Sequence, residues 1–284
     1  MLIYKIFIIF LYQLLLYDKS NKRNGGERMD IKSDVKKQFG RSAASYVTSE
    51  GHRKGGDLQT LIALADATGT ELALDVATGG GHTANALAPR VRKVIALDLT
   101  PEMLAAAEKF IKGNGHENVE YVEGDAEKLP FSDESFNIVS CRIAPHHFPN
   151  ITSFVSEVSR VLKTGGQFLL DDNVAPENKE FDEFYNTVEK KRDYSHFRAW
   201  KKTEWLQMLE NEGFEIQELY RFDKPFDFES WCNRMNLSDN EMAELNEYMR
   251  NSSEKVKQKF RIQIENDKII SFQGEAFVLK ATKL

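Results

Sequence analysis

The stretch LDVATGGGH, from Leu74 to His82, decides how this chain folds. It begins as a short apolar strand that contains an acid, Asp75, and it continues directly into a turn that includes Gly79 and Gly81. Glycine lets the backbone approach a ligand closely, while the Asp75 carboxylate can bind a cationic or hydroxylated part of that ligand. The motif therefore predicts a site for a nucleotide-like cofactor at the end of this strand.

Around this motif, short apolar runs alternate with helical patterns. The predicted strands are 72–76, 91–97, 119–122, 136–141 and 167–171, and the predicted helices are 82–88, 101–112 and 152–162. Strict alternation predicts parallel strands joined by right-handed crossovers, with the ligand outside the strands' carboxyl ends. Two helices are expected before the motif, at 30–48 and 55–67. After it we expect helices at 181–192 and 203–212, a strand at 214–221, a hairpin at 261–272 and a last strand at 275–281.

Composition excludes several classes of protein. The chain has 284 residues and a formal net charge of −6, so it offers no broad basic surface for a nucleic-acid backbone. Its two cysteines, Cys141 and Cys232, lie far apart and form neither a disulfide framework nor a metal-ligand pattern. We expect no metal site and a reducing, cytoplasmic location.

Residues 1–28 do not match the rest of the chain. The apolar run 2–17 is short for a membrane span and lacks the cleavage site of a signal peptide. We interpret 1–28 as a mis-annotated leader upstream of a start at Met29, with a genuine apolar anchor as the alternative. The predicted domain is 29–284, and no membrane association is expected unless the leader is real.

Three carboxylates fall at or just after the ends of three predicted strands: Asp75, Asp98 and Asp125. Because such ends lie side by side in a doubly wound sheet, all three can line one crevice. Asp98 follows the glycines by about twenty residues, the interval at which an acid can accept both hydroxyls of a ribose. Asp125, with Ala126 beside it, is placed to meet an adenine edge.

Two cofactors compete for this pattern. Gly79, Gly81 and Ala84 match the dinucleotide pattern G-x-G-x-x-A, which supports an NAD(P)-dependent oxidoreductase. However, a pyrophosphate would meet the Asp75 carboxylate just before the turn, whereas S-adenosylmethionine carries an ammonium and a sulfonium and no phosphate. The residues favour S-adenosylmethionine, and a module that binds it without catalysis is a further alternative.

The sequence resembles the class I S-adenosylmethionine-dependent methyltransferases, within them the ubiquinone/menaquinone C-methyltransferase-like group. The matching blocks are LDVATGGGH, ALDLTPEML from Ala96, GDAEKLPF from Gly124, SFNIVSCRIAPHHF from Ser135 and RVLKTGG from Arg160. The resemblance implies a Rossmann-like doubly wound α/β sheet of seven strands, mostly parallel with an antiparallel last strand and with helices on both faces. It also implies methyl transfer to a small molecule, possible acceptors being a quinone precursor or another aromatic or phenolic compound.

Carried over to this chain, the family pattern assigns the cofactor site residue by residue. Asp75, Gly79 and Gly81 would surround the methionine part, Asp98 the ribose, and Asp125 with Ala126 the adenine, whose face would pack on Leu99. Met103 is expected to fill the core or line the cofactor groove. Ala77 and Thr78 stand where the family usually has glycine and cysteine, and Ala77 needs no left-handed backbone if its φ is negative. Arg142 would join the site or pair with a neighbouring acid.

Residues after the fourth predicted strand are candidates for catalysis. His146 and His147 stand at the expected crevice mouth, where either can act as a general base or be an ordinary loop histidine. His52, with Tyr46, belongs to a segment that packs over the cofactor in the family, where it either helps to close the site or is a solvent-facing loop histidine. Residues 173–212 would form a substrate cap. This segment either contacts a planar, anionic acceptor or is a solvated helix followed by a loop. In the first case the contacts would come from Tyr194, Phe197 and Trp200 and from the cations Arg198 or Lys201. Residues 222–272 would add C-terminal elements. The oligomeric state is not predicted.

Overall fold

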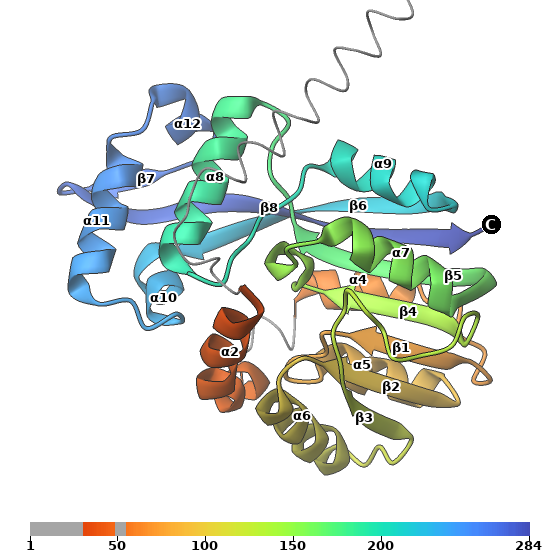
Figure 1. The fold of residues 1–284 in the computed structure, drawn as a ribbon. Coiled ribbons are helices and arrows are strands. Elements are labelled where there is room, and N and C mark those ends of the chain that lie inside the picture. Colours follow the sequence, from red (N-terminus) through yellow and green to blue (C-terminus); the bar gives the residue numbers. More distant parts are fainter. Residues whose placement is uncertain (1–30, 49–54) are drawn as a thin grey trace, which may run out of the picture. The chain divides into compact units, whose positions relative to one another are not determined.

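The structure, a computed structural model, describes residues 31–48 and 55–284 (Figure 1). The predicted leader 1–28 and the candidate His52 lie outside the described residues. Two helices precede the sheet, α2 (Ile31–Thr48) and α4 (Gly56–Ala63), close to the predicted ranges. Within the described ranges, no helix combines the length and the apolar character that crossing a membrane requires.

The strands form one sheet in the order β3-β2-β1-β4-β5-β8-β6, and a short β7 pairs with β8 beside this path. The first five strands pair in parallel, whereas β8 runs antiparallel to both β5 and β6. The prediction of a mostly parallel sheet with an antiparallel last strand is confirmed, and β7 is an addition to the seven expected strands. The bounds are β1 Leu72–Val76, β2 Lys93–Asp98, β3 Val119–Glu123, β4 Phe136–Arg142, β5 Leu162–Asn173, β6 Phe214–Asp227, β7 Gln263–Glu265 and β8 Lys268–Lys283.

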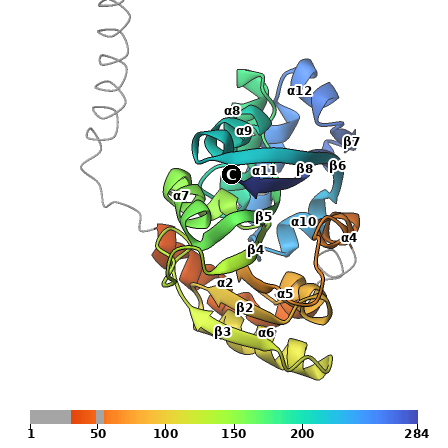
Figure 2. The same cartoon turned by 90° about the vertical axis from the view of Figure 1, so that its right-hand side faces the viewer.

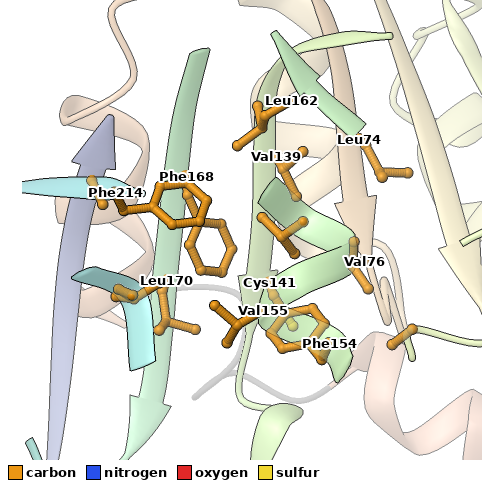
Figure 3. Close-up of a cluster of buried hydrophobic side chains, with 14 of the residues drawn as sticks. Leu74, Val76, Val139, Cys141, Phe154, Val155, Leu162, Phe168, Leu170 and Phe214 are labelled. Carbon is orange, nitrogen blue, oxygen red and sulfur yellow. The ribbon is translucent and has the colours of Figure 1, made fainter. Parts of the chain in front are cut away.

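Helices cover both faces of this sheet (Figure 2). On one face α4, α5 (His82–Leu87) and α6 (Pro101–Gly113) bury the side chains of Ala73, Ala96 and Ile138. On the other, α7 (Ile151–Val161) and α9 (Lys202–Asn211) pack on alternate strand residues. Figure 3 shows Phe154 and Val155 of α7 among strand side chains, including Cys141. Because both faces are covered, the central strands are mainly apolar, and their polar residues lie toward their carboxyl ends, as in Asp75 of β1 and Asp171 of β5.

The order of the strands in the sheet determines where the ligand site lies. β1 pairs with β2 on one side and with β4 on the other, and the chain crosses to the opposite side of β1 after β3. Ligands of such folds bind outside the carboxyl ends of the strands at this switch point. Asp75 and Asp98 lie at the carboxyl ends of β1 and β2, and two single-turn helices, η1 (Ala88–Arg90) and η2 (Pro145–His147), follow α5 and β4.

The C-terminal part builds a second layer of structure on the long ends of β6 and β8. Helix α8 (Lys179–Arg192) packs there with α10 (Phe228–Asn233), α11 (Asp239–Arg250) and α12 (Glu254–Lys259) around Trp231 and Phe272. The helices α10, α11 and α12 were not predicted. The predicted hairpin is present, since Asn266 and Asp267 form the turn between β7 and β8 with φ values of 47° and 62°.

Candidate active site

Asp75 organises the loop between β1 and α5. One of its oxygens, Oδ2, accepts hydrogen bonds from Thr78 Oγ1 at 2.6 Å and from Ala84 N at 3.1 Å, and Oδ1 accepts from Ser140 Oγ at 2.7 Å. Burial raises the pKa of this carboxyl to about 6, and the three donors favour the ionised form. Asp75 lines the pocket described below, but each of its oxygens already binds the chain's own donors.

The backbone at Ala77 does not have a negative φ. Its φ is +54°, in the left-handed region, where an alanine costs about 1–2 kcal/mol more than in the right-handed region. The turn needs this conformation because Thr78 is held on both sides: its N–H donates to Leu97 O at 2.9 Å and its hydroxyl to Asp75. The requirement for positive φ explains why the family usually has glycine here.

Gly79 and Gly81, predicted to share one role, have different ones. Both have positive φ, 52° and 82°. Gly79 lines the pocket with open space where a Cβ would stand. A Cβ on Gly81 would instead lie 2.9 Å from Ala107 Cβ and from Ile111 Cδ1 of α6. Gly81 is not among the pocket-lining residues, and the absence of a side chain there permits the close packing of α5 against α6.

Asp98 bridges the glycine loop and the start of α6. Its Oδ2 accepts from Gly79 N at 2.8 Å and its Oδ1 from Thr100 N at 2.9 Å. Burial raises the pKa of Asp98, an effect that these backbone donors oppose. A carboxylate oxygen has about two lone-pair sites, so each oxygen retains acceptor capacity after one backbone bond.

Asp125 lies across the pocket and contacts α2. Lys32 Nζ is 2.6 Å from Asp125 Oδ2 and 2.6 Å from Glu127 Oε2. The Glu127 amide donates to the other oxygen of Asp125 at 2.9 Å. The sequence analysis missed Lys32 and the apolar pair Val35 and Phe39, whose spacing of four residues on a predicted helix is the signal that indicates an apolar face.

These groups meet in one pocket with about 1040 Å³ of empty space, part of it open to solvent. Every predicted cofactor residue except Gly81 lines it, so Asp75, Asp98 and Asp125 do converge. The lining residues are Lys32, Val35, Phe39, Asp75, Ala77, Thr78, Gly79, Gly80, His82, Thr83, Leu97, Asp98, Leu99, Thr100, Met103, Gly124, Asp125, Ala126, Glu127, Arg142, Ile143, Ala144, His147, Phe148 and Pro149.

Arg142 belongs to a buried ion cluster at the edge of the pocket. Its Nε lies 2.9 Å from Asp171 Oδ2 and its Nη2 lies 3.1 Å from Asp57 Oδ2, which Lys224 Nζ also contacts at 2.9 Å. Burial alone would raise the pKa of Asp57, but the two cations lower it. Burial raises the pKa of Asp171 to about 7, an effect that Arg142 opposes. Arg142 therefore pairs with neighbouring acids, as the second of its two predicted roles has it.

The structure separates the two candidate histidines. His147 lines the pocket, and its ring makes an edge contact with the Phe39 ring at 5.1 Å between centroids. His146 is not among the lining residues, and neither is Asp172, whose Oδ1 lies 2.6 Å from His146 Nδ1. Sequence reasoning treated the two as equivalent because nothing local distinguishes adjacent histidines.

The predicted cap cations bind acids of their own chain. Arg198 Nη2 lies 3.1 Å from Asp182 Oδ2 and contacts Glu204, and Lys201 Nζ lies 3.3 Å from the same Asp182 oxygen. Both cations therefore form ion pairs within the chain, which agrees with the interpretation of this segment as a solvated helix and loop. Tyr194 and Phe197 remain 45% and 40% exposed.

Comparison with known proteins identifies the family. A methyltransferase domain model matches residues 74–170. The uncharacterized methyltransferase YcgJ of Bacillus subtilis is 35% identical over 246 residues, covering 86% of this chain and 97% of that protein. The chain belongs to the S-adenosylmethionine-dependent methyltransferases. Its cofactor is S-adenosylmethionine, and the oxidoreductase alternative is wrong.

Two further proteins are similar to this chain. A crystal structure of a candidate methyltransferase from Bacillus halodurans C-125 is 58% identical, with a TM-score of 0.79, and covers 81% of this chain and 99% of that chain. The demethylmenaquinone methyltransferase of Chlorobaculum tepidum is 40% identical over 113 residues, which is 39% of this chain and 45% of that protein.

Proposed function

We propose that the methyltransferase methylates a small aromatic or quinoid acceptor that loses a proton during the reaction, and that His147 is the base. The pocket lining supports this class, since the apolar residues Phe39, Phe148 and Pro149 line it together with His147, and the Phe39 ring lies 5.1 Å from the imidazole between centroids. The likeness to a demethylmenaquinone methyltransferase agrees with it, although that likeness covers 39% of this chain.

The observation that carries the proposal is the hydrogen bonding of His147. Its Nδ1 lies 3.0 Å from the carbonyl oxygen of Ser195, which can only accept, so Nδ1 carries the proton and Nε2 has a free lone pair. Burial lowers the pKa of His147 to about 4, and the ring is therefore neutral near pH 7. Asp193 Oδ2, 4.0 Å from Nε2, would stabilise the imidazolium formed by proton transfer.

The pocket residues also fit the cofactor. In this proposal Asp98 uses its remaining lone pairs to accept the ribose hydroxyls, and Leu99 and Met103 contact the adenine ring. Asp125 and Ala126 face the adenine edge, and the loop ordered by Asp75 holds the methionine part. The apolar lining and the acceptor oxygens match a ligand that has hydroxyls, an amine and no phosphate.

S-adenosylmethionine supplies a methyl group bound to a positively charged sulfur. The acceptor's O–H or activated C–H gives its proton to Nε2 of His147, and the released electron pair forms the bond to the methyl carbon. The electrons of the carbon–sulfur bond stay on sulfur, which becomes neutral. The chain's contribution is to align acceptor and methyl group and to hold the base in place, and alignment alone can supply about 7–11 kcal/mol in well-oriented systems.

Turnover with methyl-labelled cofactor tests the proposal. Phenolic, quinoid and amine acceptors are offered to the wild type, to His147→Gln and to Asp133→Asn, a control at an exposed carboxylate that pairs with Arg160. We expect labelled phenols or quinols, with kcat reduced about 10²- to 10⁴-fold in His147→Gln and unchanged in the control. Transfer to amines alone, to no acceptor, or at full rate without His147 would contradict the proposal.

A further inference from the structure

A buried histidine–carboxylate pair, His146 and Asp172, lies next to the proposed base His147. His146 Nδ1 is 2.6 Å from Asp172 Oδ1, and Asp172, at the end of β5, has no exposed surface. An ionised carboxylate can only accept hydrogen bonds, so His146 Nδ1 donates to it. The backbone carbonyl of His146 accepts from the Phe197 and Arg198 amides at 2.9 and 3.0 Å, which fixes this residue against the following loop.

The rings of His146 and His147 lie 4.3 Å apart between centroids. At this separation, away from water, two imidazolium charges repel strongly, so a proton on one ring disfavours a proton on the other. The contacts of the two rings differ. His146 has the full charge of Asp172 at hydrogen-bond distance, whereas His147 has a neutral carbonyl on Nδ1 and a carboxylate only at 4.0 Å.

Other charged and titratable groups surround the pair. Helix α8 contributes Tyr185, Glu189, Lys190 and Arg192, and the following loop contributes Asp193 and His196. Glu189 and Arg192 pair at 3.2 Å, and Lys190 Nζ binds the carbonyls of Tyr194 and His196. The ring of His196 lies 5.6 Å from that of His146, and its Nε2 is hydrogen-bonded to Asn186. Asp172 is thus the carboxylate in direct contact with His146.

We propose that Asp172 is a positioning residue that keeps His146 protonated, and that this neighbouring positive charge preserves His147 as the neutral imidazole that removes the acceptor's proton. The inference rests on the proposed function of His147. The opposite shifts of the two pKa values agree with it: burial lowers the pKa of His146, but Asp172, with Glu189 and Asp193, raises it by more, whereas burial and His146 together lower that of His147.

Nuclear magnetic resonance titration of the histidine ring signals tests this without any acceptor. In Asp172→Asn the charge on His146 loses its partner, so we expect the His147 pKa to rise by about one unit or more. His146→Gln retains a donor toward Asp172 but removes the charge, and we expect a rise at least as large. Asp133→Asn, the exposed control, should leave the His147 titration unchanged. Thermal unfolding checks that each variant is folded, and His146→Gln keeps the test decisive if Asp172→Asn does not fold.

The pH dependence of kcat gives a second readout. If His147 is the base, the acid limb of the kcat profile should move to higher pH in both variants by the amount seen for the ring. A His147 pKa that is the same in the wild type and both variants would overturn the inference. Failure of the proposed base role would show differently, as full kcat in His147→Gln.

Discussion

Ala77 has a backbone conformation that glycine adopts at little cost. Substituting Ala77 by glycine tests whether this conformation lowers the stability of the protein. Ala77→Gly removes the left-handed penalty of about 1–2 kcal/mol but adds unfolded-state entropy, so we expect a net stabilisation of about 0.5–1 kcal/mol. Urea unfolding measures it. The matched control is Ala73→Gly in the buried strand β1, where the methyl group packs in the core and its loss should destabilise the fold. Equal destabilisation by both changes would contradict the account.

The depressed pKa of His147 predicts a pH dependence of stability. Between pH 6.5 and about 4 the unfolded chain binds a proton at this residue and the folded chain does not. The contribution of His147 to the free energy of unfolding is therefore fully present above pH 6.5, and it decreases as the pH falls toward 4. We expect His147→Gln to show a smaller loss of unfolding free energy over this range than the wild type, measured by urea unfolding at several pH values. Identical slopes for the two proteins would refute the neutral, buried state of this ring.

At the scale of elements, two glycines two positions apart serve different contacts. Gly81→Ala places a methyl group 2.9 Å from Ala107 and Ile111 at a φ of +82°, so α5 and α6 must separate. Overpacking and backbone strain together predict a destabilisation of about 2–4 kcal/mol. Gly79→Ala meets open space and should cost only about 1–2 kcal/mol of stability, for its left-handed backbone.

Substitutions of Gly79 and Gly81 also distinguish an effect on helix packing from an effect on cofactor binding. Because Gly79 lines the pocket and Gly81 does not, Gly79→Ala should weaken S-adenosylmethionine binding more than Gly81→Ala does in protein that remains folded. Thermal unfolding and calorimetric titration of both variants give the two measurements. If Gly81→Ala proved as stable as Gly79→Ala, the close packing of these helices would not be the reason for the glycine.

Helix α2 illustrates what local patterns miss. Its sequence reads as a polar helix, yet Lys32 binds Asp125 and Glu127, and Val35 and Phe39 line the pocket. Each partner lies far along the chain, so composition alone does not reveal the contact. The short helices α11 and α12 were missed although Ser238 and Ser253 cap them, and Ser238 with Glu241 forms a capping box that the sequence displays.

Across the whole molecule, the features set by regular patterns were predictable and those set by long-range contacts were not. Strand 72–76 was predicted to the residue, and the topology rule predicted one crevice for the three carboxylates, which do line one pocket. The different environments of His146 and His147 depend on Asp172 and Ser195, which lie 26 and 48 residues further along the chain. Likewise, the ion cluster of Arg142 joins β4 to α4 and β6, which no spacing within the sequence encodes.

The central claim is that Asp98 binds the cofactor in the pocket that the three carboxylates share. Calorimetric titration of S-adenosylmethionine into the wild type, Asp98→Ala and the exposed control Asp133→Asn tests it most directly. Losing charge-assisted hydrogen bonds worth about 3 kcal/mol in total predicts roughly 100-fold weaker binding by Asp98→Ala and no change in the control. Wild-type affinity in a folded Asp98→Ala variant would contradict the account.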